Sequence, residues 1–122
     1  MQLILSLVAA AALAAQGVPP AAVASFLDAV AAGDLATARS ILSDGAMIVD
    51  ESEGNDASSL DLFAERIRGC ERTGLTWDVD QEDSARAASV VTWTCPSGAS
   101  AEAFIWTERA KVVAIQFGPS SR

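Results

Sequence analysis

Hydrophobic residues in the first half of the chain recur at intervals of three and four, which is the spacing of amphipathic helices. This spacing predicts a first helix over residues 23–31 and a second over residues 35–42. Gly33 can end the first helix in the left-handed conformation. Asp34 can then accept hydrogen bonds from the free amides that begin the second.

The region between residues 43 and 69 is predicted to contain a short strand, a loop and a third helix. The chain is expected to turn at Asp44-Gly45 and to form a strand over residues 46–49. The polar stretch over residues 51–58 predicts a loop. A helix over residues 60–67 follows, with Ser58 or Ser59 as its N-cap.

From Gly74 onward the hydrophobic period changes from three-and-four to two, which is typical of strands. Four strands are expected, over residues 75–79, 90–95, 101–106 and 111–117, with a hairpin turn at residues 96–98. Helices followed by regular strands predict an α+β domain whose three helices cover one side of a curved sheet.

One predicted strand places a carboxylate beside two large aromatic side chains. Glu102, Phe104 and Trp106 occupy alternate positions and therefore share one face of the sheet. If that face lines a pocket, Glu102 could act as a general base or as a neutral hydrogen-bond donor. If the strand is shifted or terminal, Glu102 is solvated.

Length and charge limit the number of domains and the kinds of partner expected for this chain. A chain of 122 residues forms one domain. Sixteen acidic residues against eight basic ones give a net charge of −8, which repels phosphate backbones and anionic membranes. Nucleic acid is therefore not an expected partner.

The first fifteen residues have the pattern of an export signal. They are apolar from Leu3 onward and end near Ala12-Leu13-Ala14, a small-x-small sequence that signal peptidase accepts. A buried helix or a membrane anchor is the alternative, but the apolar run is shorter than the roughly 20 residues that a span requires. We expect residues 1–15 to be a signal peptide and residues 16–122 to be an exported domain, periplasmic or secreted, with no membrane partner.

The only two cysteines are Cys70 and Cys95. In an exported chain such a pair indicates a disulfide, whereas in a cytosolic chain it more often means two buried thiols. The chain has no histidine, so no metal site and no cofactor are expected, and triads that need an imidazole are excluded.

Several short sequences resemble the nuclear transport factor 2-like superfamily, also called SnoaL-like or ketosteroid-isomerase-like. They are Ala32-Gly33-Asp34-Leu35, Asp44-Gly45-Ala46 and the segment over residues 106–113. The resemblance implies a cone-like curved mixed or antiparallel sheet, packed against three helices from the N-terminal half. It also implies an apolar pocket between sheet and helices.

The resemblance also assigns positions. Asp50 corresponds to the catalytic base of the steroid isomerases, and Glu102 to the acid that helps to hold the enolate oxygen. Phe26 replaces their oxyanion tyrosine, and the chain contains no tyrosine. Loss of one oxyanion donor typically lowers the rate by about a hundredfold to a thousandfold.

Two classes of function follow, and a third is common in the superfamily. The first is binding of a small apolar molecule in the cone; the second is an isomerase, cyclase or lyase in which Asp50 is the base and Glu102 assists. The third is a structural role as a homodimer paired through the outer face of the sheet. The aromatic residues expected to line the pocket, or otherwise to form plain core, are Phe26, Phe63, Trp77, Trp93, Phe104 and Trp106.

Overall fold

The computed structural model describes residues 20–51 and 56–119. The predicted signal peptide lies outside these residues. Within them, no helix has the length and apolar character needed to cross a lipid bilayer.

Three helices form where the three-and-four spacing predicts them: α2 (Ala21–Ala31), α3 (Leu35–Ile41) and α4 (Leu60–Arg66). Asp34 caps α3 as expected, because its carboxylate accepts hydrogen bonds from the Thr37 hydroxyl at 2.6 Å and the Thr37 amide at 3.1 Å. The hydrogen bond from the Thr37 hydroxyl is the main cause of a lowered pKa of Asp34, and the bond from the Thr37 amide lowers this pKa further. This cap therefore stabilises the fold above the ordinary pKa of an aspartate and is lost as the pH falls through the lowered value. Ser59 caps α4 through Leu62 N–H at 3.2 Å.

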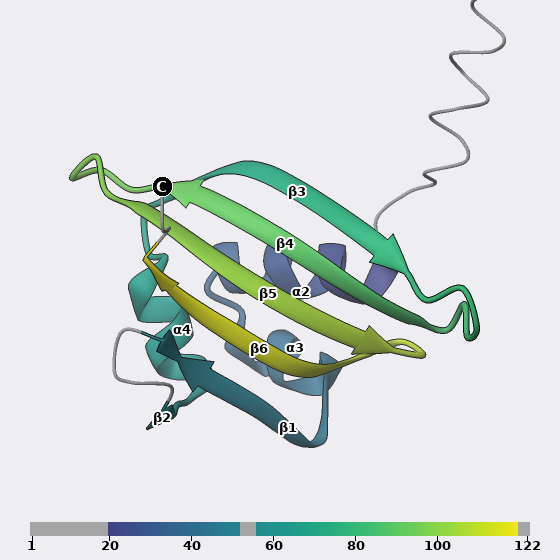
Figure 1. Cartoon of the computed structure of the whole chain (residues 1–122). Coiled ribbons are helices and arrows are strands. Elements are labelled where there is room, and N and C mark those ends of the chain that lie inside the picture. Colours follow the sequence, from purple (N-terminus) through teal and green to yellow (C-terminus); the bar gives the residue numbers. More distant parts are fainter. Residues whose placement is uncertain (1–19, 52–55, 120–122) are drawn as a thin grey trace, which may run out of the picture.

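The strands form one mixed sheet in the order β2-β1-β6-β5-β4-β3. Figure 1 shows this order from the lower edge to the upper edge, with all three helices behind the sheet. Strand β1 runs parallel to β6, and every other pair is antiparallel. The strands are β1 (Leu42–Asp50), β2 (Asp56–Ala57), β3 (Glu71–Val79), β4 (Arg86–Thr94), β5 (Ser100–Glu108) and β6 (Lys111–Pro119).

The first strand differs from the sequence prediction. It begins at Leu42, directly after α3, and Asp44-Gly45 lies inside it instead of forming a turn before it. The register between β1 and β6 shifts between Leu42 and Met47, and Gly45 has a φ of 75°. A bulge at a residue that tolerates positive φ bends the strand without ending it. The predicted loop also contains the two-residue strand β2, which pairs with the end of β1.

The hydrophobic core lies between the helices and the face of the sheet that they cover, which we call the inner face. Phe63 of α4 is fully buried at its centre. Its ring lies 6.1 Å from that of Phe26, 6.0 Å from that of Trp93 and 5.2 Å from that of Phe117. These four aromatic side chains, which we call the aromatic cluster, pack together between the helices and the sheet near the ends of β4 and β6. A hollow of about 510 Å³ lies beside Trp93, bordered by residues of all three helices.

A disulfide joins Cys70 to Cys95, as the sequence predicts. Cys70 follows α4, and Cys95 lies between β4 and β5. The bond therefore ties the end of the third helix to the sheet, next to the aromatic cluster residue Trp93.

Candidate functional site

The aromatic residues that the sequence assigned to one pocket lie in different places. Phe26, Phe63 and Trp93 belong to the packed aromatic cluster. Trp77 is half-buried on the inner face, where it pairs with Ser89 of β4. Phe104 and Trp106 lie on the opposite face of the sheet, which none of α2, α3 and α4 covers and which we call the outer face.

Glu102 shares the outer face with Phe104 and Trp106, as strand alternation predicts. Its neighbours Ala103 and Ile105 are fully buried on the inner face. Asp50 is also buried, 1% exposed, and its register partner on β6 is Phe117 of the aromatic cluster. Asp50 and Glu102 thus lie on opposite faces, and the interpretation in which they act together in one pocket does not fit this geometry.

Asp50 is held by a cation. Its carboxylate accepts a hydrogen bond from the guanidinium of Arg66 at 3.0 Å, and Arg66 is 38% exposed. Arg66 lies in the last turn of α4, so the ion pair fastens the end of β1 to that helix. A carboxylate engaged in this way is better suited to joining two elements than to removing a proton from a substrate.

We expect Arg66→Met to lower the free energy of unfolding by about 1.5 to 3 kcal/mol, the range for hydrogen bonds to charged groups. Arg39→Met is the matched control, because Arg39 also extends from a helix to an aspartate, Asp61, at 3.5 Å. Both partners of that pair are exposed, so its loss should cost less than about 1 kcal/mol. Urea denaturation measures both. Equal losses of unfolding free energy in the two variants would show that the burial of Asp50 does not strengthen its ion pair with Arg66.

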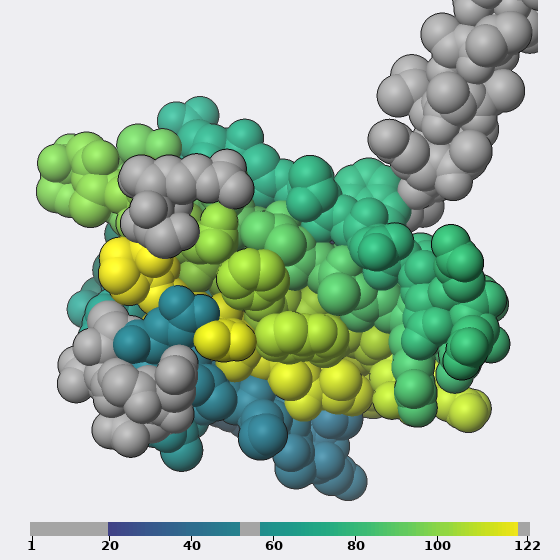
Figure 2. Space-filling view, in the orientation of Figure 1, coloured from purple at the N-terminus to yellow at the C-terminus, as the bar shows by residue number. Residues whose placement is uncertain are grey.

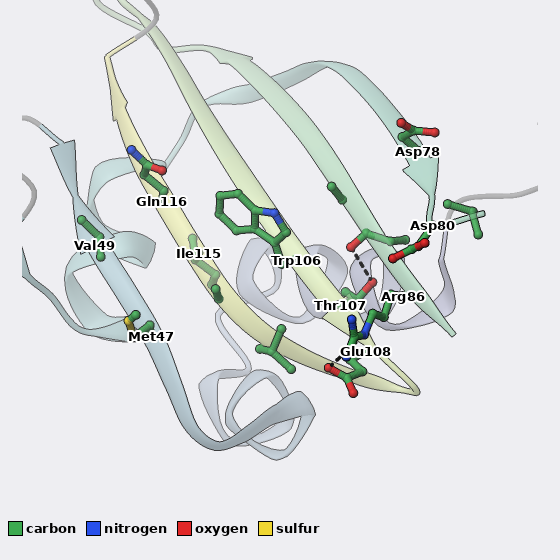
Figure 3. Close-up of a pocket in the computed structure, with 15 residues that line it drawn as sticks. Met47, Val49, Asp78, Asp80, Arg86, Trp106, Thr107, Glu108, Ile115 and Gln116 are labelled. Carbon is green, nitrogen blue, oxygen red and sulfur yellow. Dashed lines mark hydrogen bonds and ion pairs between the residues drawn. The ribbon is translucent and has the colours of Figure 1, made fainter. Parts of the chain in front are cut away.

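A hollow with a volume of about 720 Å³ lies on the outer face. Trp106 lies in the middle of it, with Met47 and Val49 of β1 on one side and Asp78 of β3 on the other (Figure 3). In Figure 2, which looks onto the same face, the green and yellow side chains of β4, β5 and β6 lie open to solvent. We call this hollow the outer groove.

The register of the sheet explains why a hollow forms there. Trp106 pairs with Ala88 on β4 and with Ala114 on β6, so each side of the indole meets a methyl group. Beyond the alanines, Ala88 pairs with Asp78 and Ala114 with Met47. A large side chain between two small ones leaves space on both sides. Phe104 supports the indole from the next row, with its ring centroid 6.2 Å away.

The groove is apolar along most of its length and charged at one end. Met47 is 62% exposed and Trp106 37% exposed, which is unusual for such large apolar side chains. The charged lining consists of three carboxylates and one guanidinium, and Figure 3 shows them together on the side of β3 and the β5–β6 turn. They are Asp78, Asp80, Glu108 and Arg86.

Of the aromatic residues that the sequence assigns to a binding site, Trp106 lines the outer groove and Phe104 packs beside it. The other residues of the groove were not predicted. Ala88, Ala114 and Met47 carry no chemistry that marks them in a sequence. In the sequence, Asp78 is one polar residue between the apolar Trp77 and Val79 of a predicted strand, and nothing else marks it. Their contribution depends on cross-strand register, which the alternation within a single strand does not specify.

The sequence matches no protein-family model and no curated protein. Solved structures do match. A candidate ketosteroid isomerase from Kribbella flavida is 12% identical, with a TM-score of 0.58 over 84% of this chain and 78% of the other.

Two further structures give similar values. A candidate polyketide cyclase from Silicibacter is 19% identical, with a TM-score of 0.54 over 82% of this chain and 87% of the other. A nuclear transport factor 2-like protein of unknown function from Shewanella baltica is 12% identical, with a TM-score of 0.54 over 83% and 90%. With the order of helices and strands, these likenesses show that the chain has the nuclear transport factor 2-like fold.

Proposed function

We propose that this domain binds a small apolar molecule without transforming it, and that the molecule lies in the outer groove over Trp106. One observation carries the proposal: an apolar hollow of about 720 Å³ surrounds a partly exposed indole on the outer face. That volume is within the range of small-molecule sites, roughly 300 to 1,000 Å³. The hollow of about 510 Å³ on the helix side of Trp93 is bordered instead by the charged side chains of Asp28, Arg68 and Arg72. The proposal keeps the ligand class expected from the sequence and moves its site.

A second copy of the chain is the main competitor for the outer face. It would bring another net charge of −8 to a face that already carries an acidic end. The two alanines beside Trp106 also make a hollow, whereas a face that pairs with another sheet needs side chains that interdigitate. These features favour a small ligand.

An isomerase, cyclase or lyase in which Asp50 is the base has one observation in its favour, which is the burial of that carboxylate. Against it, Arg66 engages Asp50, and Glu102 lies on the other face. Phe26 offers no hydroxyl to a developing oxyanion. Asp50 therefore lacks the partner groups that such a reaction needs, and we favour binding.

Export of the domain is part of the proposal. The apolar segment over residues 1–15 supports it, and a disulfide between the only two cysteines is compatible with an oxidising compartment.

We expect the protein to bind Nile red, a neutral apolar dye whose emission rises in apolar sites. Trp106→Ala should weaken this binding by about tenfold or more, because a central aromatic side chain commonly supplies much of the binding energy. Fluorescence titration measures the effect. Near-ultraviolet circular dichroism and the urea midpoint show whether the variant is folded.

A second variant fills the groove and keeps the indole. Ala114→Leu should block the dye, whereas Ala36→Leu, the same change at an exposed position of α3, should leave binding unchanged. Native mass spectrometry reports the assembly. A stable dimer that takes up no dye would overturn the proposal in favour of pairing through the outer face.

A further inference from the structure

We infer that the ligand of the outer groove is an amphipathic cation: a flat apolar body that lies against Trp106 and a single positive group that lies at Asp78. This inference rests on the proposed function and adds a charge to the ligand. It follows from the position of one carboxylate relative to the indole and from the balance of charge at that end of the groove.

Asp78 and Trp106 lie in the same cross-strand row, separated only by Ala88. Two strand spacings place their backbones about 10 Å apart. Ala88 leaves the space between them open, so a ring seated on the indole can extend an arm to the carboxylate without crossing a side chain larger than a methyl group. Figure 3 shows Asp78 on the far side of the groove from Met47. One end of the groove is thus apolar and the other acidic.

Asp78 has its charge available for a ligand. It is exposed and, within residues 20–51 and 56–119, has no ion-pair partner. The one cation of the groove, Arg86, lies 3.7 Å from Glu108 and 3.6 Å from Asp83. Arg86 is therefore already paired with two carboxylates, which leaves Asp78 and Asp80 as net negative charge.

The aromatic platform and the net charge of the protein favour the same ligand. The face of an indole carries partial negative charge and attracts cations. A net charge of −8 raises the local concentration of cations and repels anions. A neutral apolar molecule would use the indole but leave the carboxylate unused, and an anion would be repelled by it.

The test compares two probes of nearly the same shape, 1-naphthylmethylamine and 1-naphthalenemethanol, by isothermal titration calorimetry on the full domain. We expect the amine to bind more tightly. Asp78→Asn should weaken the amine by about twofold to fivefold, the range for a partly exposed ion pair, and leave the alcohol unchanged. The preference for the amine should also fall as salt is added.

The control is Glu71→Gln, which removes the same charge from the same strand at a residue that does not line the groove. An equal effect of Asp78→Asn and Glu71→Gln would assign the preference to net charge and overturn the role of Asp78. If the alcohol binds as tightly as the amine and Trp106→Ala weakens both, the inference fails while the proposed function stands. If neither probe binds to a protein that still takes up Nile red, the inference alone fails. Failure to bind Nile red overturns the proposed function itself.

Discussion

Phe63→Ala is expected to lower the free energy of unfolding by about 3 to 5 kcal/mol. The Phe63 side chain is fully buried and contacts the three other rings of the aromatic cluster, at centroid distances of 5.2 to 6.1 Å. Its removal loses the transfer free energy of the ring and leaves a cavity that rigid aromatic neighbours cannot fill. Small domains have only about 5 to 15 kcal/mol of stability, so this single change should bring the protein near its unfolding threshold. Urea denaturation followed by circular dichroism measures it.

Phe104→Ala is the matched control, because it removes the same side chain from the outer face, where Phe104 is only half-buried. Its cost should be less than half that of Phe63→Ala. Phe63→Leu, which keeps most of the apolar volume, should cost under about 1.5 kcal/mol. If Phe63→Ala costs no more than Phe104→Ala, the cone is not packed as described, and the case for moving the ligand to the outer groove is lost with it.

Removal of the disulfide by Cys70→Ala with Cys95→Ala should lower the free energy of unfolding by about 3 to 4 kcal/mol. The two cysteines are 25 residues apart, and the bond restricts that loop in the unfolded chain. The double variant also loses the covalent connection between the end of α4 and the sheet. The urea midpoints of the oxidised protein and of the double variant give the difference.

The oxidised protein treated with a reductant is the second arm of this experiment. It should resemble the double variant in stability, because both lack the cross-link. A double variant that is as stable as the oxidised protein would show that the cross-link does not lower the entropy of the unfolded chain by the expected amount. Neither cysteine lines the outer groove, so the proposed binding of Nile red should survive reduction wherever the domain remains folded.

The helices and the four long strands could be predicted because their signals are local. Asp34 caps a helix by bonding a residue three positions away, and Ser59 does the same. The spacing of the apolar residues identifies the buried face of each helix or strand separately, without reference to its neighbours. The Asp44-Gly45 pair was misplaced because a turn and a bulge use the same residue types, and only pairing with β6 decides between them.

The location of the outer groove could not be predicted, because it depends on which face of β5 the helices cover. The large side chains Phe104 and Trp106 suggested that theirs was the covered face. In the structure the inner positions of β5 are small where the neighbouring strands are large: Ala101 pairs with Trp93, and Ala103 with Phe117. On the inner face, large side chains of one strand therefore lie opposite small side chains of the next, so that each row is filled evenly. This pairing cannot be predicted from the sequence of one strand.

The place of β6 in the sheet has a consequence for the order in which the chain can fold. Among the described strands, β6 joins the pair β2-β1 to the meander β5-β4-β3, yet it follows all of them in sequence. Ile48 cannot pair with Ile115 until β6 has formed. The Ser40 carbonyl likewise accepts its hydrogen bond from the ammonium of Lys111, which lies 71 residues later. Such distant pairing is slow to form. A nascent chain emerging from the ribosome should therefore hold most of its first strand, apart from the end that pairs with β2, without a strand partner until β6 has been synthesised. Residues 42–48 are then the segment that a chaperone would have to shield longest.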